Sequence, residues 1–170
     1  MQISPVHQLP QITWHSLSFN QLTIDLLYDV LALRSKVFVL EQNSAYDDVD
    51  DIDKYALHLV GLDANLRLLA YARLIPVGVK YPQYASIGRV VILPELRNLG
   101  LGKQLIEKAV FYCTQFFGAH TQLKLSSQLD KEPIYHKQGF RRTTRKPYSD
   151  GGILHVDMVM RPKTLYSPQA

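Results

Sequence analysis

Cysteine is almost absent from the 170-residue sequence: Cys113 is the only one, so the chain cannot form an internal disulfide bond. No apolar run approaches the roughly 20 residues that a membrane-spanning helix needs. Residues 1–15 show neither the basic stretch nor the apolar stretch of a secretory signal. These absences argue against a secreted disulfide-rich protein and a membrane protein, and we expect a cytoplasmic location.

Metal-binding and nucleic-acid-binding patterns are missing as well. No cluster of cysteine and histidine has the spacing of a metal site, and we expect no metal. The net charge is +4, but the basic residues are dispersed along the chain. Aromatic and basic residues do not interleave as they do in RNA-binding sheets, so we expect neither a nucleic acid nor a membrane as partner.

The length predicts one domain over residues 1–170, with a loose N-terminal arm (1–10) and a loose C-terminal tail (162–170). Hydrophobic periodicity predicts strands at 12–17, 56–62, 66–75, 84–93, 122–127, from 140 onward and at 153–160. It predicts helices at 22–38 and 99–117, a short helix after Asp130, and a turn at 148–152. This order predicts an α+β domain with a mixed, mainly antiparallel sheet.

A glycine-containing turn joins the strand at 84–93 to the long helix at 99–117. Such a turn exposes backbone N–H groups at a helix N-terminus, which is an arrangement that binds phosphate. Two common phosphate motifs are excluded, because Lys103-Gln104-Leu105 supplies neither the third Rossmann glycine nor the P-loop Ser/Thr. The helix pattern predicts a buried stripe of Leu101, Leu105, Ala109, Tyr112, Cys113 and Phe116.

The turn has the form R-x-x-G-x-G from Arg97 to Gly102, and Tyr135-x-x-x-Gly139-Phe140 follows about 30 residues later. This pair resembles the Gcn5-related N-acetyltransferase (GNAT) superfamily. Other stretches, including Glu41-Gln42-Asn43, the aspartate run after Tyr46, Arg89 and His155, resemble its ElaA-like branch. The resemblance implies a central twisted sheet of about seven strands flanked by about four helices.

The resemblance further implies that acetyl-CoA is the co-substrate. Its pantetheine arm would pair with the strand before the turn, where a backbone N–H near Val91 would face the thioester oxygen. The cofactor-binding residues implied in this way are Val90, Val91, Ile92, Arg97, Asn98, Leu99, Gly100, Leu101, Gly102, Lys103, Gln128 and Tyr135.

The resemblance gives Tyr135 the role of general acid toward the CoA thiolate, and a packing role is the alternative. The general base stays open between Glu41, His155, His58 and a water molecule, since a histidine on a strand is more often structural. Arg34, Arg73 and Arg89 are either substrate-binding residues that point into a cleft or members of ion pairs with acids such as Glu41 or Asp157.

The acidic run holds five aspartates: Asp47, Asp48, Asp50, Asp51 and Asp53. It lacks the glycine and the distal glutamate of a calcium-binding loop. We interpret it as a solvated loop, with attraction of a cationic acceptor as the alternative.

We therefore expect an enzyme that transfers an acetyl group from acetyl-CoA to a primary amine of a small molecule or peptide. Transfer would be direct, in a ternary complex, because no nucleophile stands beside an evident base. The alternative is a non-catalytic acyl-CoA-binding regulatory module. The sequence leaves open the acceptor, the use of longer acyl-CoAs, and whether the protein is a monomer or a homodimer.

Overall fold

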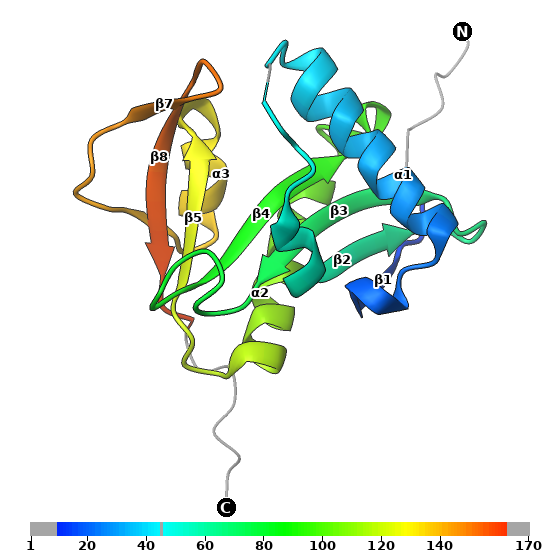
Figure 1. Cartoon of the computed structure of the whole chain (residues 1–170), viewed down its shortest axis with the longest axis horizontal. Coiled ribbons are helices and arrows are strands. Elements are labelled where there is room, and N and C mark those ends of the chain that lie inside the picture. The colour runs from blue at the N-terminus through cyan, green and yellow to red at the C-terminus, as the bar shows by residue number, and fades with distance from the viewer. Residues whose placement is uncertain (1–9, 45, 163–170) are drawn as a thin grey trace, which may run out of the picture.

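The computed structural model describes residues 10–44 and 46–162, so the predicted arm and tail lie outside the described residues apart from Pro10 and Pro162. An eight-stranded sheet in the order β1-β2-β3-β4-β5-β8-β6, with β7 paired to β8, forms its centre (Figure 1). The strands are β1 (Thr13–Ser18), β2 (Leu57–Leu62), β3 (Leu68–Ile75), β4 (Ala85–Ile92), β5 (Leu123–Gln128), β6 (Arg141–Arg142), β7 (Tyr148–Asp150) and β8 (Ile153–Met160). Among the described strands only β4 and β5 pair in parallel, which confirms the mixed, mainly antiparallel sheet, with one more strand than expected.

Helices cover both faces of the sheet. The helix α1 (Ile24–Arg34) begins after Thr23, whose Oγ1 accepts the Leu26 N–H at 3.2 Å, and it continues into a π-helical segment, Ser35–Glu41. Val30, Leu33 and Val37 pack on one face against a group of strand residues: Val60, Leu62, Leu68, Tyr71 and Val91. The other face packs against α2 (Leu101–Phe117), and the short α3 (Glu132–Lys137) follows β5.

Three local predictions differ from the structure. The helix expected at 22–38 is divided, because α1 gives way to the π-helical segment after Arg34. The turn expected at 148–152 includes the strand β7, because Tyr148 pairs with His155 of β8. Phe116 was expected in the buried stripe of α2 but is 56% exposed, whereas Ile106 is buried in its place.

The two parallel strands separate soon after they meet. Backbone pairing joins Ala85 to Leu123 and Ser86 to Lys124, and the further residues of β4 and β5 pair only with β3 and β8, respectively. Figure 1 shows the two strands diverging from this point. Main-chain groups on the inner edges of both strands are therefore left without a strand partner.

Gly61 of β2 provides a test of the packing between β1 and β2. It lies opposite Trp14, and a Cβ there would come within 2.8 Å of the Trp14 ring and 3.1 Å of Ile12. We expect Gly61→Ala to lower the free energy of unfolding by about 1–3 kcal/mol, because the ring must move.

Gly88→Ala in β4 is the matched control, since the nearest atom to its added Cβ is Ile75 Cδ1 at 4.0 Å. Its effect should stay within about 0.5 kcal/mol. Urea denaturation measures the free energy of unfolding of both variants. An unchanged m-value would show that the difference lies in stability and not in the compactness of the folded or denatured state. Equal losses in the two would contradict the assigned packing of Trp14.

Candidate active site

The turn before α2 presents an array of free backbone N–H groups. Asn98 and Gly100 have φ values of 65° and 85°, and the helix begins at Leu101. Within the described chain, the N–H groups of residues 99–103 donate to no main-chain acceptor, whereas Gln104 N donates to Gly100 O at 3.4 Å. The array adds to the positive end of the helix dipole and fits a pyrophosphate.

Gly102 brings this array against the end of β4. A Cβ at Gly102 would lie 3.3 Å from Ile92 Cδ1, which is tighter than ordinary van der Waals contact. The first turn of α2 therefore packs directly beside the strand to which the GNAT resemblance assigns the pantetheine arm. A larger residue here would have to displace the side chain of Ile92 at the end of β4.

The two basic residues of the turn are both in ion pairs. Arg97 donates to both carboxylate oxygens of Glu41, at 2.6 and 3.0 Å, and Lys103 Nζ lies 3.7 Å from Glu107. The hydrogen bond from Arg97 lowers the pKa of the Glu41 carboxyl. The predicted base Glu41 thus lies beside the turn before α2 and is held there by Arg97.

Strand alternation identifies which main-chain groups of β4 face the separation from β5. Leu93 N donates to Leu69 O of β3 at 2.9 Å, and Tyr71 pairs with Val91. Because successive residues of a strand point their N–H groups to opposite sides, Val90 and Ile92 face away from β3. The N–H expected near Val91 is therefore that of Val90 or Ile92.

Tyr135 lies in α3, which a 3-10 helical turn (Leu129–Lys131) joins to β5, and its ring packs edge-on against Phe140 at 6.0 Å between centroids. The side chain is half-buried. Burial raises the pKa of its phenol to about 12, so the hydroxyl keeps its proton at neutral pH.

Gln128 and His155 lie opposite each other on β5 and β8. Gln128 Nε2 donates to Gln42 Oε1 at 2.9 Å, which links β5 to the residue after the π-helical segment. His155 Nδ1 donates to Ile153 O at 2.9 Å, so Nε2 carries the lone pair of the neutral ring. Gln42 received no role from the sequence, although it stands in the Glu41-Gln42-Asn43 stretch.

His58 is completely buried in β2. Its Nε2 donates to Asp53 O at 3.0 Å, and its Nδ1 accepts the Tyr71 hydroxyl at 2.8 Å. Desolvation lowers the pKa of the ring, which keeps it neutral. Both nitrogens of this predicted base candidate are therefore engaged inside the core.

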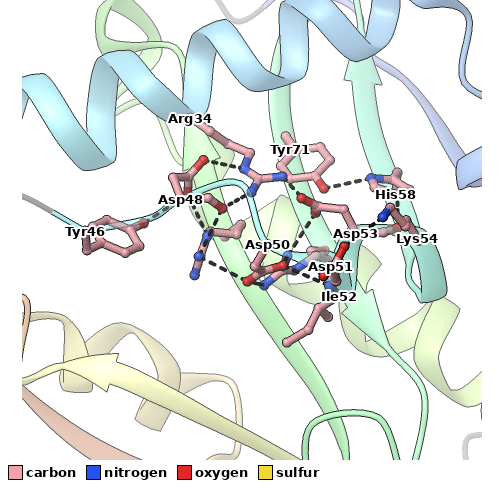
Figure 2. A network of polar contacts seen from close by, with 12 residues as sticks. Arg34, Tyr46, Asp48, Asp50, Asp51, Ile52, Asp53, Lys54, His58 and Tyr71 are labelled. Atoms are coloured by element: carbon pink, nitrogen blue, oxygen red, sulfur yellow. Dashed lines mark hydrogen bonds and ion pairs between the residues drawn. The ribbon is translucent and has the colours of Figure 1, made fainter.

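The three arginines form a closed ring of ion pairs with three aspartates of the acidic run, and Figure 2 shows Arg34 among Asp48, Asp50 and Asp53. Arg34 contacts Asp48 and Asp53, Arg73 contacts Asp50 and Asp53, and Arg89 contacts Asp48 and Asp50; the closest N–O distance in each pair lies between 2.5 and 3.5 Å. Arg34 and Arg73 are 0% and 2% exposed. Of the two arrangements that the sequence left open, the structure has the ion pairs, but their partners are neither Glu41 nor Asp157.

The ring corrects the interpretation of the acidic run as a solvated loop. Asp48 and Asp53 are buried, because each satisfies two guanidinium groups that lie on α1, β3 or β4. Asp47 and Asp51 are exposed, as expected. Among the described residues, no three His, Cys, Asp or Glu side chains gather as a metal site, and no helix is long and apolar enough to cross a bilayer.

Comparison with known proteins identifies the family of this chain. Residues 36–162 match the family described as "Acetyltransferase (GNAT) domain". The chain belongs to this family. Its similarity to ElaA confirms the resemblance to the ElaA-like branch of GNAT proteins.

Three relatives illustrate the similarity of this GNAT domain to known members. A UPF0039 protein of Schizosaccharomyces pombe is 42% identical over 140 residues, which cover 82% of this chain and 91% of that protein. The crystal structure of Escherichia coli ElaA is 31% identical with a TM-score of 0.81, covering 89% and 100% of the two chains. An acyl-CoA N-acyltransferase from Pseudomonas aeruginosa is 34% identical with a TM-score of 0.79, covering 87% and 99%.

The ion-pair ring predicts a large cost for removing one aspartate. Asp53→Ala leaves the buried Arg34 and Arg73 each short of one carboxylate, and we expect a loss of about 3–5 kcal/mol in the free energy of unfolding. Asp51→Ala is the control, because Asp51 is exposed and pairs only with the exposed Lys54 among the described residues. It should change stability by less than about 1 kcal/mol. Denaturation curves that give the same free energy of unfolding for the two variants would refute the importance of the ring for stability.

Proposed function

We propose that this GNAT domain transfers an acetyl group from acetyl-CoA to a primary amine of a small molecule or peptide, directly within a ternary complex. The observation that carries the proposal is the array of free N–H groups at residues 99–103, beside the strand β4 that β5 leaves unpaired. CoA has both features that this site requires: a pyrophosphate that would bind the N–H array, and an extended pantetheine arm that would lie along β4.

The strand edge provides the second part of the proposed cofactor site. Val90 and Ile92 turn their main-chain groups away from β3, so they can pair with the amides of a pantetheine arm. Gln128 approaches from the β5 side. An N–H of this edge would also stabilise negative charge on the thioester oxygen.

Tyr135 is our proposed general acid. Its phenol, with a pKa of about 12, holds its proton at neutral pH. A thiol has a pKa of about 8.5 in water, so proton transfer to an exposed thiolate would be unfavourable. Desolvation around Tyr135 also raises the pKa of the departing CoA thiol. The gap between the pKa values of the phenol and the thiol therefore becomes smaller, and proton transfer becomes less unfavourable.

His155 is the base candidate that we favour. Its Nδ1–H is fixed by Ile153 O, so Nε2 is free to accept a proton, whereas Glu41 is tied to Arg97 and His58 is enclosed in the core. The amine nitrogen bonds to the acyl carbon as the C–S bond breaks with its electron pair on sulfur. The amine proton then goes to His155, directly or through water, and the thiolate takes the proton of Tyr135.

The similarity to the Pseudomonas aeruginosa acyl-CoA N-acyltransferase supports an acyl-CoA substrate and leaves the acceptor undecided. A thiol-release screen with acetyl-CoA and a panel of amines, polyamines, amino acids and peptides tests the proposal. Release of free CoA with at least one amine is expected. Binding of acetyl-CoA without turnover on any of them would favour the non-catalytic module instead.

Gly102→Glu tests the phosphate site. The added side chain would crowd Ile92 at the end of β4 and bring a negative charge to the helix N-terminus where we propose that the pyrophosphate binds, so we expect no measurable acetyl-CoA binding in calorimetry. The fold should survive, since a glutamate in the first turn of a helix is favourable. Gly102→Gln, equal in size but neutral, separates the steric effect from the charge. Unchanged affinity in Gly102→Glu would rule out this loop as the phosphate site.

Tyr135→Phe tests the general acid. We expect kcat to fall by roughly 10²-fold, with little change in the Kd for acetyl-CoA, because only the proton donor is removed. Tyr28→Phe on the exposed side of α1 is the control and should have native kinetics. Steady-state rates and calorimetry measure the two effects separately. Native kcat in Tyr135→Phe would exclude the assigned role.

A further inference from the structure

Strand β4 holds one more residue than β3 in the middle of their pairing. Arg73 lies opposite Gly88 and Tyr71 lies opposite Val91, so Ala72 alone faces both Arg89 and Val90. This two-against-one pairing is a β-bulge. Arg89 has a φ of 50°, a left-handed value at which bulges commonly carry glycine, because a Cβ is strained there.

The side chain of Arg89 is held firmly from outside the strand. Its Nε donates to Asp48 Oδ1 at 2.7 Å, and its Nη2 donates to Asp48 O at 3.3 Å. The guanidinium lies 5.2 Å from the centroid of the Tyr46 ring, and the Tyr46 hydroxyl donates to the same Asp48 carboxylate at 3.0 Å. Asp48 is in turn fixed by Arg34 of α1.

The bulge decides how the next residue is presented. Val90 follows Arg89 directly, and its N–H faces the side of β4 that β5 leaves open. If residue 89 relaxed to an ordinary extended conformation, the bulge would be lost and the alternation beyond it would shift by one residue. Val90 would then point its N–H toward β3.

We propose that Arg89 is a positioning residue for acyl transfer, which Asp48 and Tyr46 hold in a left-handed backbone conformation so that the Val90 N–H faces the thioester oxygen. This inference rests on the proposed function, because it concerns the strand edge that would receive acetyl-CoA. It gives the acidic run a part in the reaction other than attraction of a cationic acceptor. Arg89 acts here through its backbone, and its side chain touches no substrate.

Arg89→Ala and Arg89→Gly form a matched pair for the test. Both remove the same ion pairs and the same contact with Tyr46, and they differ in one methyl group and in the ease of a positive φ. We expect Arg89→Ala to lower kcat by about 10²-fold, as loss of one oxyanion donor does, and Arg89→Gly to recover most of that loss. Because the same shift would turn the Val90 and Ile92 groups that pair with the pantetheine arm, the Kd for CoA should rise in Arg89→Ala and stay near the native value in Arg89→Gly.

Hydrogen–deuterium exchange over residues 86–93 gives a readout that needs no turnover. The native protein and Arg89→Gly should exchange at similar rates in this segment, and Arg89→Ala should exchange faster. Equal rates of exchange in the two variants would overturn the proposal, and so would an equal loss of kcat. Either result would mean that the ease with which residue 89 adopts a positive φ does not matter for β4. If the native protein turned over no amine, the proposed function would fail while exchange still decided the role of Arg89 in the bulge.

Tyr46→Leu is a milder variant for the case that Arg89→Ala does not fold. It removes the ring beneath the guanidinium and one hydrogen bond to Asp48. We expect a smaller loss of kcat in the native background and no further loss in the Arg89→Gly background, where no side chain remains to be held. An equal loss in both backgrounds would mean that Tyr46 acts independently of Arg89, against the proposal.

Discussion

A closed ring of six alternating charges is the interaction on which the rest of this structure depends. Each of Asp48, Asp50 and Asp53 bridges two arginines, and each arginine bridges two aspartates. Leaving a buried guanidinium without its carboxylate costs far more free energy than burying the intact ion pair. The acidic run therefore cannot move away from the core without leaving the three arginines unpaired. The ring thereby fixes the end of α1 against the middle of β3 and β4.

The position of the turn before α2 follows from this constraint through the segment after α1. The π-helical segment starts directly after Arg34, and local π-helical geometry is common at functional sites. Glu41 at its end binds Arg97 of this turn, and Gln42 binds Gln128 of β5. One short segment therefore contacts both sides of the gap in strand pairing, and its start is held by the ring.

Local patterns in the sequence were enough for the parts of the fold that depend on neighbours along the chain. The strand, turn and helix around Gly100 and Gly102 were predictable, because periodicity and glycine placement are local properties. The burial of Asp48 and Asp53 was not, since it depends on arginines 14 to 41 positions away. The positive φ of Arg89 was equally hidden, because an arginine in an apolar run predicts an ordinary strand.

The strain at Arg89 and the stability of the ring are two aspects of one arrangement. A left-handed conformation costs a non-glycine residue of order 1–3 kcal/mol, and it persists only where the surroundings over-determine it. Here the surroundings are Asp48, which Arg34 holds directly, and Tyr46, whose hydroxyl donates to Asp48. On the proposed function, these contacts hold β4 in the conformation that would receive an acyl group, without help from that group. Preorganisation of this kind makes a single N–H effective toward a developing charge.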